Sequence, residues 1–265
     1  MSARSKRGAK SDGRMSLGQH LLELRRRLFI SAIAIVVFSI GGWFLYDPIF
    51  TAIQEPVRQM AKAHTASINF AGIGTAFDIQ LQIAVTVGAV VSSPVWLYQI
   101  FAFIVPGLTR REKRFTFGFF FSAVPLFLLG CAAGWYVFPH IVGVLGSFVP
   151  KGGVSLIEAR DYLSFVLKLV LAVGIAFVLP VFLVLLNFLG VVSANSIIKS
   201  WRWAILLIFV FCALATPSAD VGSMFLLAIP MIVLYLAAAG VAGWHDRVLR
   251  KRSEALSTDL DGAAA

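Results

Sequence analysis

The chain has 265 residues, of which 59% are hydrophobic and only 14% are charged, and its formal net charge is +10. An ordinary soluble domain carries about 25% charged residues, so this composition excludes a soluble globular protein and indicates an integral membrane protein. The positive charge alone would also suit a nucleic-acid-binding protein, but no nucleic-acid-binding motif accompanies it.

The first 15 residues are basic and polar, and we expect them to be disordered. A capping-box pattern, "SLGQ" at 16–19, then opens a predicted helix. Leu21, Leu24 and Leu28 recur on one face of this helix, which makes it amphipathic. Such a helix lies at the membrane surface and leads into the first apolar run.

Six apolar segments follow, and each is a predicted transmembrane helix. They cover residues 28–46, 81–105, 115–140, 162–189, 203–215 and 221–243. The fifth has about 13 residues, below the ~20 that an upright crossing needs, so a re-entrant segment and five spans are the alternative. We therefore predict an all-α, polytopic membrane protein, with a six-helix transmembrane domain in residues 16–243 and a largely disordered tail in 244–265.

Prolines lie inside four of the predicted spans: Pro94, Pro125, Pro180 and Pro230. Each proline removes one backbone hydrogen bond from its helix. We therefore expect kinked helices that together form a cupped bundle.

The lysines and arginines predict the orientation, because they gather on the cytoplasmic side of membrane proteins. Most of the 23 lie in the N-terminal segment, in the loops after the second and fourth spans, and in the C-terminal tail. The two long loops on the other side, 47–76 and 141–161, hold only Arg58, Lys62, Lys151 and Arg160. Both termini are therefore predicted to be cytoplasmic.

Side chains for covalent catalysis or metal binding do not cluster in the sequence. The two cysteines, Cys131 and Cys212, both lie inside apolar segments, and there is no CxxC or Cys/His motif. The histidines are scattered over both predicted sides of the membrane. We expect no disulfide, no metal site, no cofactor and no enzyme activity.

Two glutamates lie among basic residues on the predicted cytoplasmic side. Glu112 is the one acidic residue of the loop "TRREKR", and taken alone it serves as a solvated counter-ion. Glu23, in "HLLELRRRL", has Arg26 and Arg27 at helical spacing, which favours a salt bridge within the helix. The residues alone therefore leave a purely structural role open for both glutamates.

Several longer motifs span the chain: "HLLELRRRL" at 20–28, "EPV" at 55–57, "SSPVWLYQIFAFIVPGLTRREKRF" at 92–115, "YLSFVLKLVLAVGIAFVLPV" at 162–181 and "TPSADVGSMFLLAIP" at 216–230. Together they resemble the TatC family, the core membrane component of the twin-arginine protein translocase. The combination of HLxELRxRL with FxxPGLxxxE is specific, and the resemblance covers residues 16 to 243.

This resemblance implies a receptor that binds the twin-arginine signal peptides of folded proteins at its cytoplasmic face. A carboxylate holds the planar guanidinium of arginine in a bidentate pair that lysine cannot reproduce. Glu23 and Glu112 match the two signal-binding glutamates of the family. The residues that the resemblance assigns to this surface are Glu23, Glu112, Phe103, Pro106, Arg25 and His20.

The resemblance also assigns two residues to the outer face, Pro56 and Asp220. It implies partners of three kinds: single-span subunits of the TatA and TatB type, other copies of the chain, and membrane lipid. The implied location is the bacterial inner membrane, with transport driven by the proton motive force.

One position departs from the family pattern. Many TatC proteins carry a glutamate two residues before the proline of the fourth span, where this chain has Val178. Lys168 lies in the same span but about 15 Å away along the helix axis, and Gln99 is another candidate for the missing polar group.

A small secondary transporter or channel is the alternative function, and a lipid-modifying membrane enzyme is a further one. A transporter needs facing ionisable groups at mid-membrane and internal repeats, and such an enzyme needs clustered acids and histidines at one interface. The sequence shows neither pattern.

Overall fold

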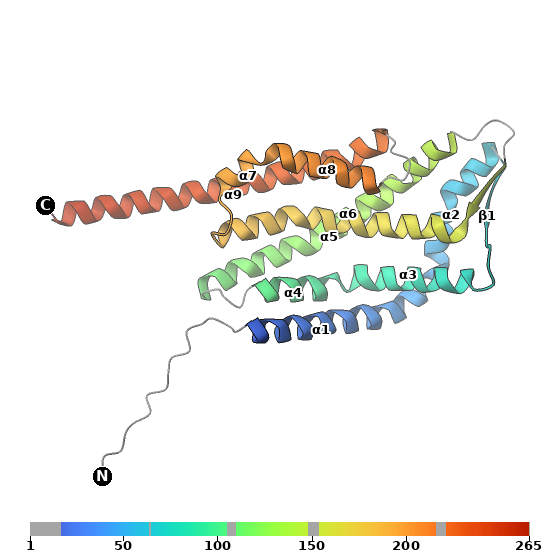
Figure 1. Ribbon diagram of the computed structural model, residues 1–265, viewed down its shortest axis with the longest axis horizontal. Coiled ribbons are helices and arrows are strands. Elements are labelled where there is room, and N and C mark those ends of the chain that lie inside the picture. The colour runs from blue at the N-terminus through green and yellow to red at the C-terminus, as the bar shows by residue number, and fades with distance from the viewer. Residues whose placement is uncertain (1–16, 64, 105–109, 148–153, 216–220, 265) are drawn as a thin grey trace, which may run out of the picture.

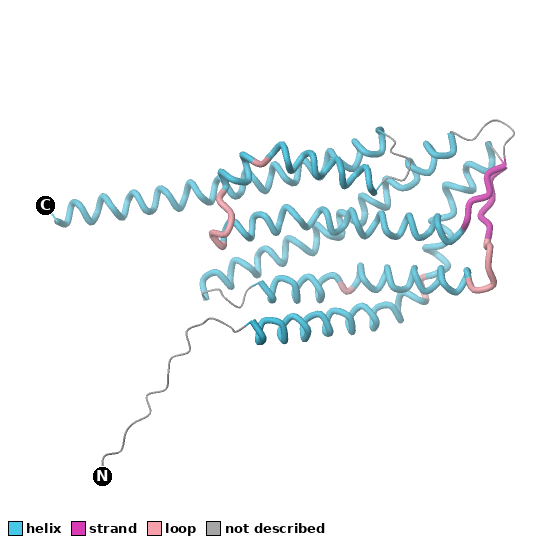
Figure 2. The backbone as a smooth tube through the Cα atoms, in the orientation of Figure 1, coloured by secondary structure: helices cyan, strands magenta, loops and turns pink. Residues whose placement is uncertain are grey.

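The structure is a computed structural model that describes residues 17–63, 65–104, 110–147, 154–215 and 221–264. Figures 1 and 2 show long helices side by side, with a pair of strands at one end. Within the described residues the elements follow in the order α1 (Leu17–Trp43), α2 (Tyr46–Ala63), β1 (Thr65–Asn69), α3 (Thr75–Val91), α4 (Ser93–Ile104), α5 (Arg110–Ser147), β2 (Val154–Glu158), α6 (Ala159–Phe188), α7 (Ala194–Lys199), α8 (Trp201–Ala215) and α9 (Val221–Ala264).

The bundle has two ends, which we name by the elements that lie there. At the tail end α1 begins, α6 ends and α9 leaves the bundle (Figure 1). At the opposite end, the cap end, lie α2 and the strands β1 and β2 (Figure 2). The long helices connect these two ends.

The helices account for three to five membrane spans in the described residues. Parts of α5 and α9 and the whole of α6 are long and apolar enough to cross a membrane, and the bent pairs α1–α2 and α3–α4 qualify if each pair is one span. Helix α8 is apolar but has only 15 residues. The prediction of a multi-pass membrane protein is confirmed, whereas the count of six spans stays a prediction.

Helix α2 lies across the cap end, because the chain turns by 77° after α1. The side chains of Ile53 and Val57 are buried, and those of Glu55 and Arg58 are exposed. One face of α2 therefore packs on the bundle. The sequence predicted a long loop here, because this stretch is too polar to be recognised as a span.

A short parallel sheet joins the two segments that the sequence predicted as outer loops. Strand β1 pairs with β2 from Thr65 opposite Val154 to Asn69 opposite Glu158. The all-α prediction is wrong for these two strands. Strand partners this far apart in the sequence leave no local pattern, because strand formation depends on the neighbouring strand.

Glycines allow α5 and α6 to approach closely at the centre of the bundle. A β-carbon on Gly130 would lie 2.9 Å from the Cα of Gly174, and a β-carbon on Gly174 would lie 2.6 Å from the Sγ of Cys131. A β-carbon on Gly134 would lie 3.0 Å from the Cα of Val170. The two helices therefore pack backbone to backbone, as small residues allow in membrane helices.

A joint between α3 and α4 directs α4 toward the beginning of α1. The two helices meet at 57°, around Ser92 and Ser93 and just before Pro94, which cannot donate a backbone hydrogen bond. The indole Nε1 of Trp96 donates to the Ala89 carbonyl across the joint at 2.8 Å. The predicted kink at Pro94 is confirmed. The other predicted kink sites lie inside unbroken helices: Pro125, Pro180 and Pro230.

Helix α9 continues beyond the bundle to Ala264 (Figure 1). This differs from the predicted disordered tail at 244–265. The segment contains several leucine, arginine and alanine residues and no proline, which favours a helix.

Asp246 on α9 accepts hydrogen bonds from both sides of the turn between α6 and α7 at the tail end. Its Oδ2 accepts the backbone N–H of Ala194 at 2.8 Å, and its Oδ1 accepts Nδ2 of Asn187 at 3.0 Å. The same amide nitrogen donates to the Val192 carbonyl at 3.0 Å. One carboxylate therefore holds three helices together.

Candidate binding surface at the tail end

Glu23 on α1 binds the guanidinium of Arg27 one helical turn further along. The Nη2 and Nε atoms of Arg27 lie 2.6 and 3.1 Å from the same oxygen, Oε1 of Glu23. Both side chains are 22% exposed. The salt bridge predicted from the spacing is confirmed with Arg27 as the partner, and Glu23 presents a carboxylate that is still accessible.

Arg27 also connects α1 to α4. Its Nη1 donates to Oε1 of Gln99 at 3.2 Å. Glu23, Arg27 and Gln99 line a hollow of about 550 Å³, which Leu22, Arg26 and Ile30 complete. The sequence singled out Gln99 as a candidate for the missing polar group of the family, and its contact with Arg27 was not predicted.

His20 and Phe103 form a second contact between α1 and α4, closer to the tail end. Their rings stack with centroids 4.3 Å apart and planes inclined by 25°. His20 lies one turn before Glu23 on α1, and Phe103 lies one turn after Gln99 on α4. The structure thus brings His20, Phe103 and Glu23 to one surface.

Arg25 does not join this group. It is exposed and does not line the hollow. Two residues along an α-helix turn a side chain by about 200°, so Arg25 lies on nearly the opposite face of α1 from Glu23. Its basic neighbour Arg27 takes the position beside the carboxylate.

The second predicted glutamate lies at the same end of the bundle. Glu112 belongs to the first turn of α5, which begins at the tail end, as α1 does (Figure 1). The side chain of Glu112 lies outside the described part of the structure, as does the whole of Pro106 in the connection from α4 to α5.

The two residues assigned to the outer face fall at different places. Pro56 is half-buried inside α2 at the cap end. Asp220 lies outside the described residues, in the link between α8 and α9.

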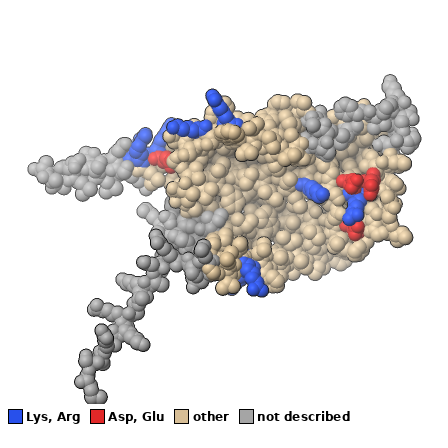
Figure 3. All heavy atoms as spheres, viewed as in Figure 1, with Lys and Arg blue, Asp and Glu red and all other residues tan. Residues whose placement is uncertain are grey.

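Charged side chains are unevenly distributed on the face in view in Figure 3. Basic side chains gather at the tail end around α7 and the adjoining part of α9, and the centre of this face is mostly uncharged. The basic residues that the structure describes there are Lys199, Arg202, Arg247, Arg250 and Lys251. A positive tail end attracts anionic lipid headgroups.

In the described residues no three histidine, cysteine or acidic side chains lie close enough to hold a metal ion. Cys131 and Cys212 are both buried, and no disulfide joins them. The contacts described at the tail end are ionic, between Glu23 and Arg27, and aromatic, between His20 and Phe103.

A family model described as Sec-independent protein translocase protein (TatC) matches residues 19–230. The chain belongs to the TatC family. The TatC protein of Xylanimonas cellulosilytica is 46% identical over 91% of this chain and 88% of its own length. The TatC protein of Rothia mucilaginosa is 36% identical over 96% of this chain and 87% of its own length. A crystal structure of the twin-arginine translocase receptor TatC in DDM has a TM-score of 0.72 and 31% identity, covering 84% of this chain and 99% of that one.

Membership of the TatC family confirms the resemblance seen in the motifs and makes the chain a component of a protein translocase. The alternatives of a small transporter and of a lipid-modifying enzyme lose their support. Val178, at the position of the expected family glutamate, is 3% exposed and packs with Leu97, Phe101 and Leu185 in an apolar core. The apolar side chain of valine suits this buried, apolar cluster.

Proposed function

We propose that this chain is the receptor subunit of a twin-arginine translocase and binds the consecutive arginines of signal peptides at its tail end. The observation that carries the proposal is the Glu23–Arg27 pair, in which Glu23 holds a guanidinium at the edge of an open hollow. An arginine of a bound peptide presents the same planar donors to this carboxylate. The similarity to a solved twin-arginine translocase receptor supports this role.

Two carboxylates serve two arginines in this proposal. Glu23 lies near the beginning of α1 and Glu112 near the beginning of α5, and both helices begin at the tail end. Phe103 lies on α4, just before the connection that contains Pro106. Its ring, stacked on His20, offers an aromatic face against which a guanidinium packs favourably.

The same proposal places the tail end in the cytoplasm of a bacterial cell. The basic residues around α7 and α9 favour this orientation. Six spans, with α8 as the short fifth one, then put both termini on the cytoplasmic side. A folded domain of ~100 residues has a radius of gyration near 13 Å, so one helical bundle does not enclose it, and transport requires TatA- and TatB-type partners, further copies of the chain and the proton motive force.

The test is direct binding of signal peptides to the purified full chain in nanodiscs. An Arg-Arg peptide should bind at least tenfold more tightly than its Lys-Lys twin, and both Glu23→Gln and Glu112→Gln should remove most of this preference. The reason is that each substitution removes a charge-assisted hydrogen bond, which contributes about 1.5–3 kcal/mol to the binding free energy.

Glu55→Gln provides the matched control, because Glu55 is an exposed glutamate on α2 at the opposite end. It should leave the preference unchanged. Equal binding of both peptides by the unaltered chain would contradict the proposed function.

A further inference from the structure

Two polar contacts bridge α3 and α6 one helical turn apart near the cap end. The Nη2 of Arg160 lies 3.5 Å from Oδ2 of Asp78, and Oγ of Ser164 donates to Oε1 of Gln82 at 2.7 Å. Both helices run from the cap end toward the tail end (Figure 1), and residues four positions apart share a helix face. One turn further along, the next residue after Gln82 on this face of α3 is Thr86, and the next after Ser164 on α6 is Lys168.

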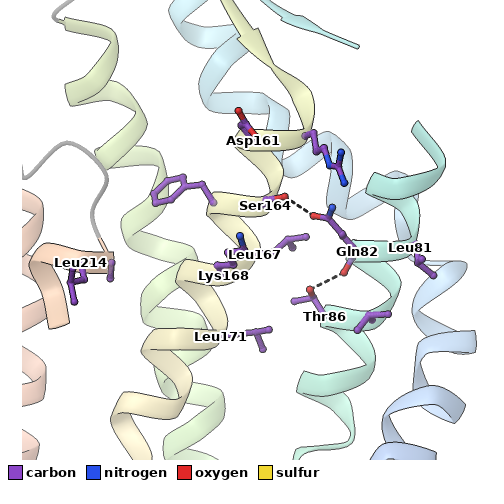
Figure 4. Close-up of a pocket in the computed structure, with 13 residues that line it drawn as sticks. Leu81, Gln82, Thr86, Asp161, Ser164, Leu167, Lys168, Leu171 and Leu214 are labelled. Carbon is purple, nitrogen blue, oxygen red and sulfur yellow. Dashed lines mark hydrogen bonds between the residues drawn. The ribbon is translucent and has the colours of Figure 1, made fainter. Parts of the chain in front are cut away.

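Lys168 lines a groove of about 910 Å³ between α3, α6 and the end of α8. Figure 4 shows Gln82 and Thr86 extending from α3 toward α6, with Lys168 across the groove from them. The remaining lining is largely apolar and includes Leu81, Val85, Phe165, Leu171 and Leu214. Such a lining suits a ligand that has a charged head and a hydrocarbon chain.

The ammonium group of Lys168 forms no ion pair in the described part of the chain. The hydroxyl of Thr86, at the same level on α3, donates to the backbone carbonyl of Gln82. A lysine within a membrane-spanning segment is costly unless it meets an anion or reaches the interface. In the described part of the chain, the third pair in this series, Thr86 and Lys168, therefore gives the lysine no anionic partner.

The short helix α8 brings the membrane surface to the level of this groove. With 15 residues, α8 is about 22 Å long, less than the ~30 Å of a hydrocarbon core. Its last residues, Leu214 and Ala215, line the same groove as Lys168, and Figure 1 shows α8 ending well before α2 and β1. A bilayer that matches α8 is thinned beside it, so the headgroups on the cap side lie close to Lys168.

We propose that this groove binds the headgroup phosphate of an anionic phospholipid from the cap-side leaflet, with Lys168 as the phosphate ligand and the leucine-rich walls holding an acyl chain. Asp161 is exposed at the mouth of the groove, and the charge of Arg160 is already paired with Asp78. The mouth therefore repels small anions that arrive from water. A lipid enters instead from the side, beside the end of α8. The proposal does not depend on signal-peptide recognition.

The experiment measures phospholipid binding to the delipidated full chain by native mass spectrometry, with phosphatidylglycerol and phosphatidylcholine as separate probes. Lys168→Gln should lower the affinity for phosphatidylglycerol about fivefold, the effect of one lysine near an anionic headgroup. Lys168→Arg should restore it. Arg58→Gln is the matched control, because it removes an exposed positive charge at the same end but outside the groove, and it should leave the affinity unchanged.

Four results would overturn the proposal. Unchanged affinity in Lys168→Gln excludes Lys168 as a phosphate ligand. An equal loss for both lipids shows that the groove holds acyl chains only, and displacement of phosphatidylglycerol by inorganic phosphate identifies a site for free phosphate. A loss of co-purified single-span partner, with lipid affinity unchanged, assigns the lysine to a carboxylate of a docking helix.

Discussion

Within the chain itself, the carboxylate of Glu23 is already paired with Arg27. In the proposed binding mode, a peptide arginine therefore exchanges with the guanidinium of Arg27. Arg27 directs two hydrogen bonds to one oxygen of Glu23 and a third to Gln99. The pair is partly exposed, which makes it weak enough to be displaced. Under this proposal, recognition depends on the difference in free energy between two similar ion pairs, and an incoming lysine has fewer matched donors for the exchange.

Removal of this internal competitor should strengthen binding. Arg27→Gln is expected to raise the affinity for an Arg-Arg peptide by up to about fivefold, because a partly exposed ion pair contributes ~0.2–1 kcal/mol. Peptide titration in nanodiscs measures the effect, and Arg25→Gln, with the same loss of charge outside the hollow, should change little. Weaker binding in Arg27→Gln would mean that Arg27 holds Glu23 in its binding position.

The sequence predicted those side-chain contacts that follow from helical spacing. Glu23 and Arg27 are four residues apart, and the structure confirms their pairing. The contact of Arg27 with Gln99 spans 72 positions, so no local pattern could predict it. The placement of Arg25 on the signal-binding surface came from the family motif, and helix geometry places this residue on another face.

At the scale of whole helices, α5 and α6 are so close at their contact that backbone atoms set the distance between them. Gly130 and Gly174 lie opposite each other, and neither position has room for a β-carbon. Membrane helices gain their stability from such close packing, because lipid gives no hydrophobic driving force between them. The position of α6, and of the groove that it lines, therefore depends on these glycines.

Gly130→Val should destabilise the chain by about 1–3 kcal/mol, the usual cost of overpacking a tight interface. Gly143→Val is the control on the same helix, because nothing lies within 4 Å of a β-carbon built at Gly143. Denaturant titration in detergent, followed by helical circular dichroism, compares the two variants. Equal midpoints for the two variants would show that α5 and α6 move apart without cost.

Elements were predictable from the sequence to the extent that hydropathy determines them. The apolar segments correspond to α1, α3 with α4, α5, α6, α8 and α9, and the shortness of α8 was predicted. The cap-end elements were missed because α2 is amphipathic and because β1 and β2 depend on pairing between segments far apart in the sequence. The Asp246 contacts with Asn187 and Ala194 were missed for the same reason of distance.

The whole molecule differs at its two ends. The tail end carries the hollow around Glu23, and the cap end carries the α3–α6 groove, α2 and the sheet. The proposed functions of the two ends thus belong to opposite sides of the membrane. According to the two proposals, a peptide is recognised on one side and a lipid headgroup is held on the other.

Single cysteines test this orientation directly. Ile73→Cys lies at the cap end, where Ile73 is 108% exposed, and Ser196→Cys lies on exposed α7 at the tail end. A membrane-impermeant maleimide should label Ile73→Cys in intact cells and Ser196→Cys only after lysis. The native Cys131 and Cys212 are buried, so the unaltered chain should show little labelling. The reverse pattern would place the tail end outside the cell.

The joint between α3 and α4 has a mechanical consequence for the tail-end surface. Gln99 and Phe103 lie one turn apart on α4, and they contact Arg27 and His20 on α1. Because both contacts belong to the short segment beyond the joint, a change in its 57° angle moves them together. The Arg27–Gln99 and His20–Phe103 contacts are therefore geometrically coupled, because a change at the joint that lengthens one of them also lengthens the other.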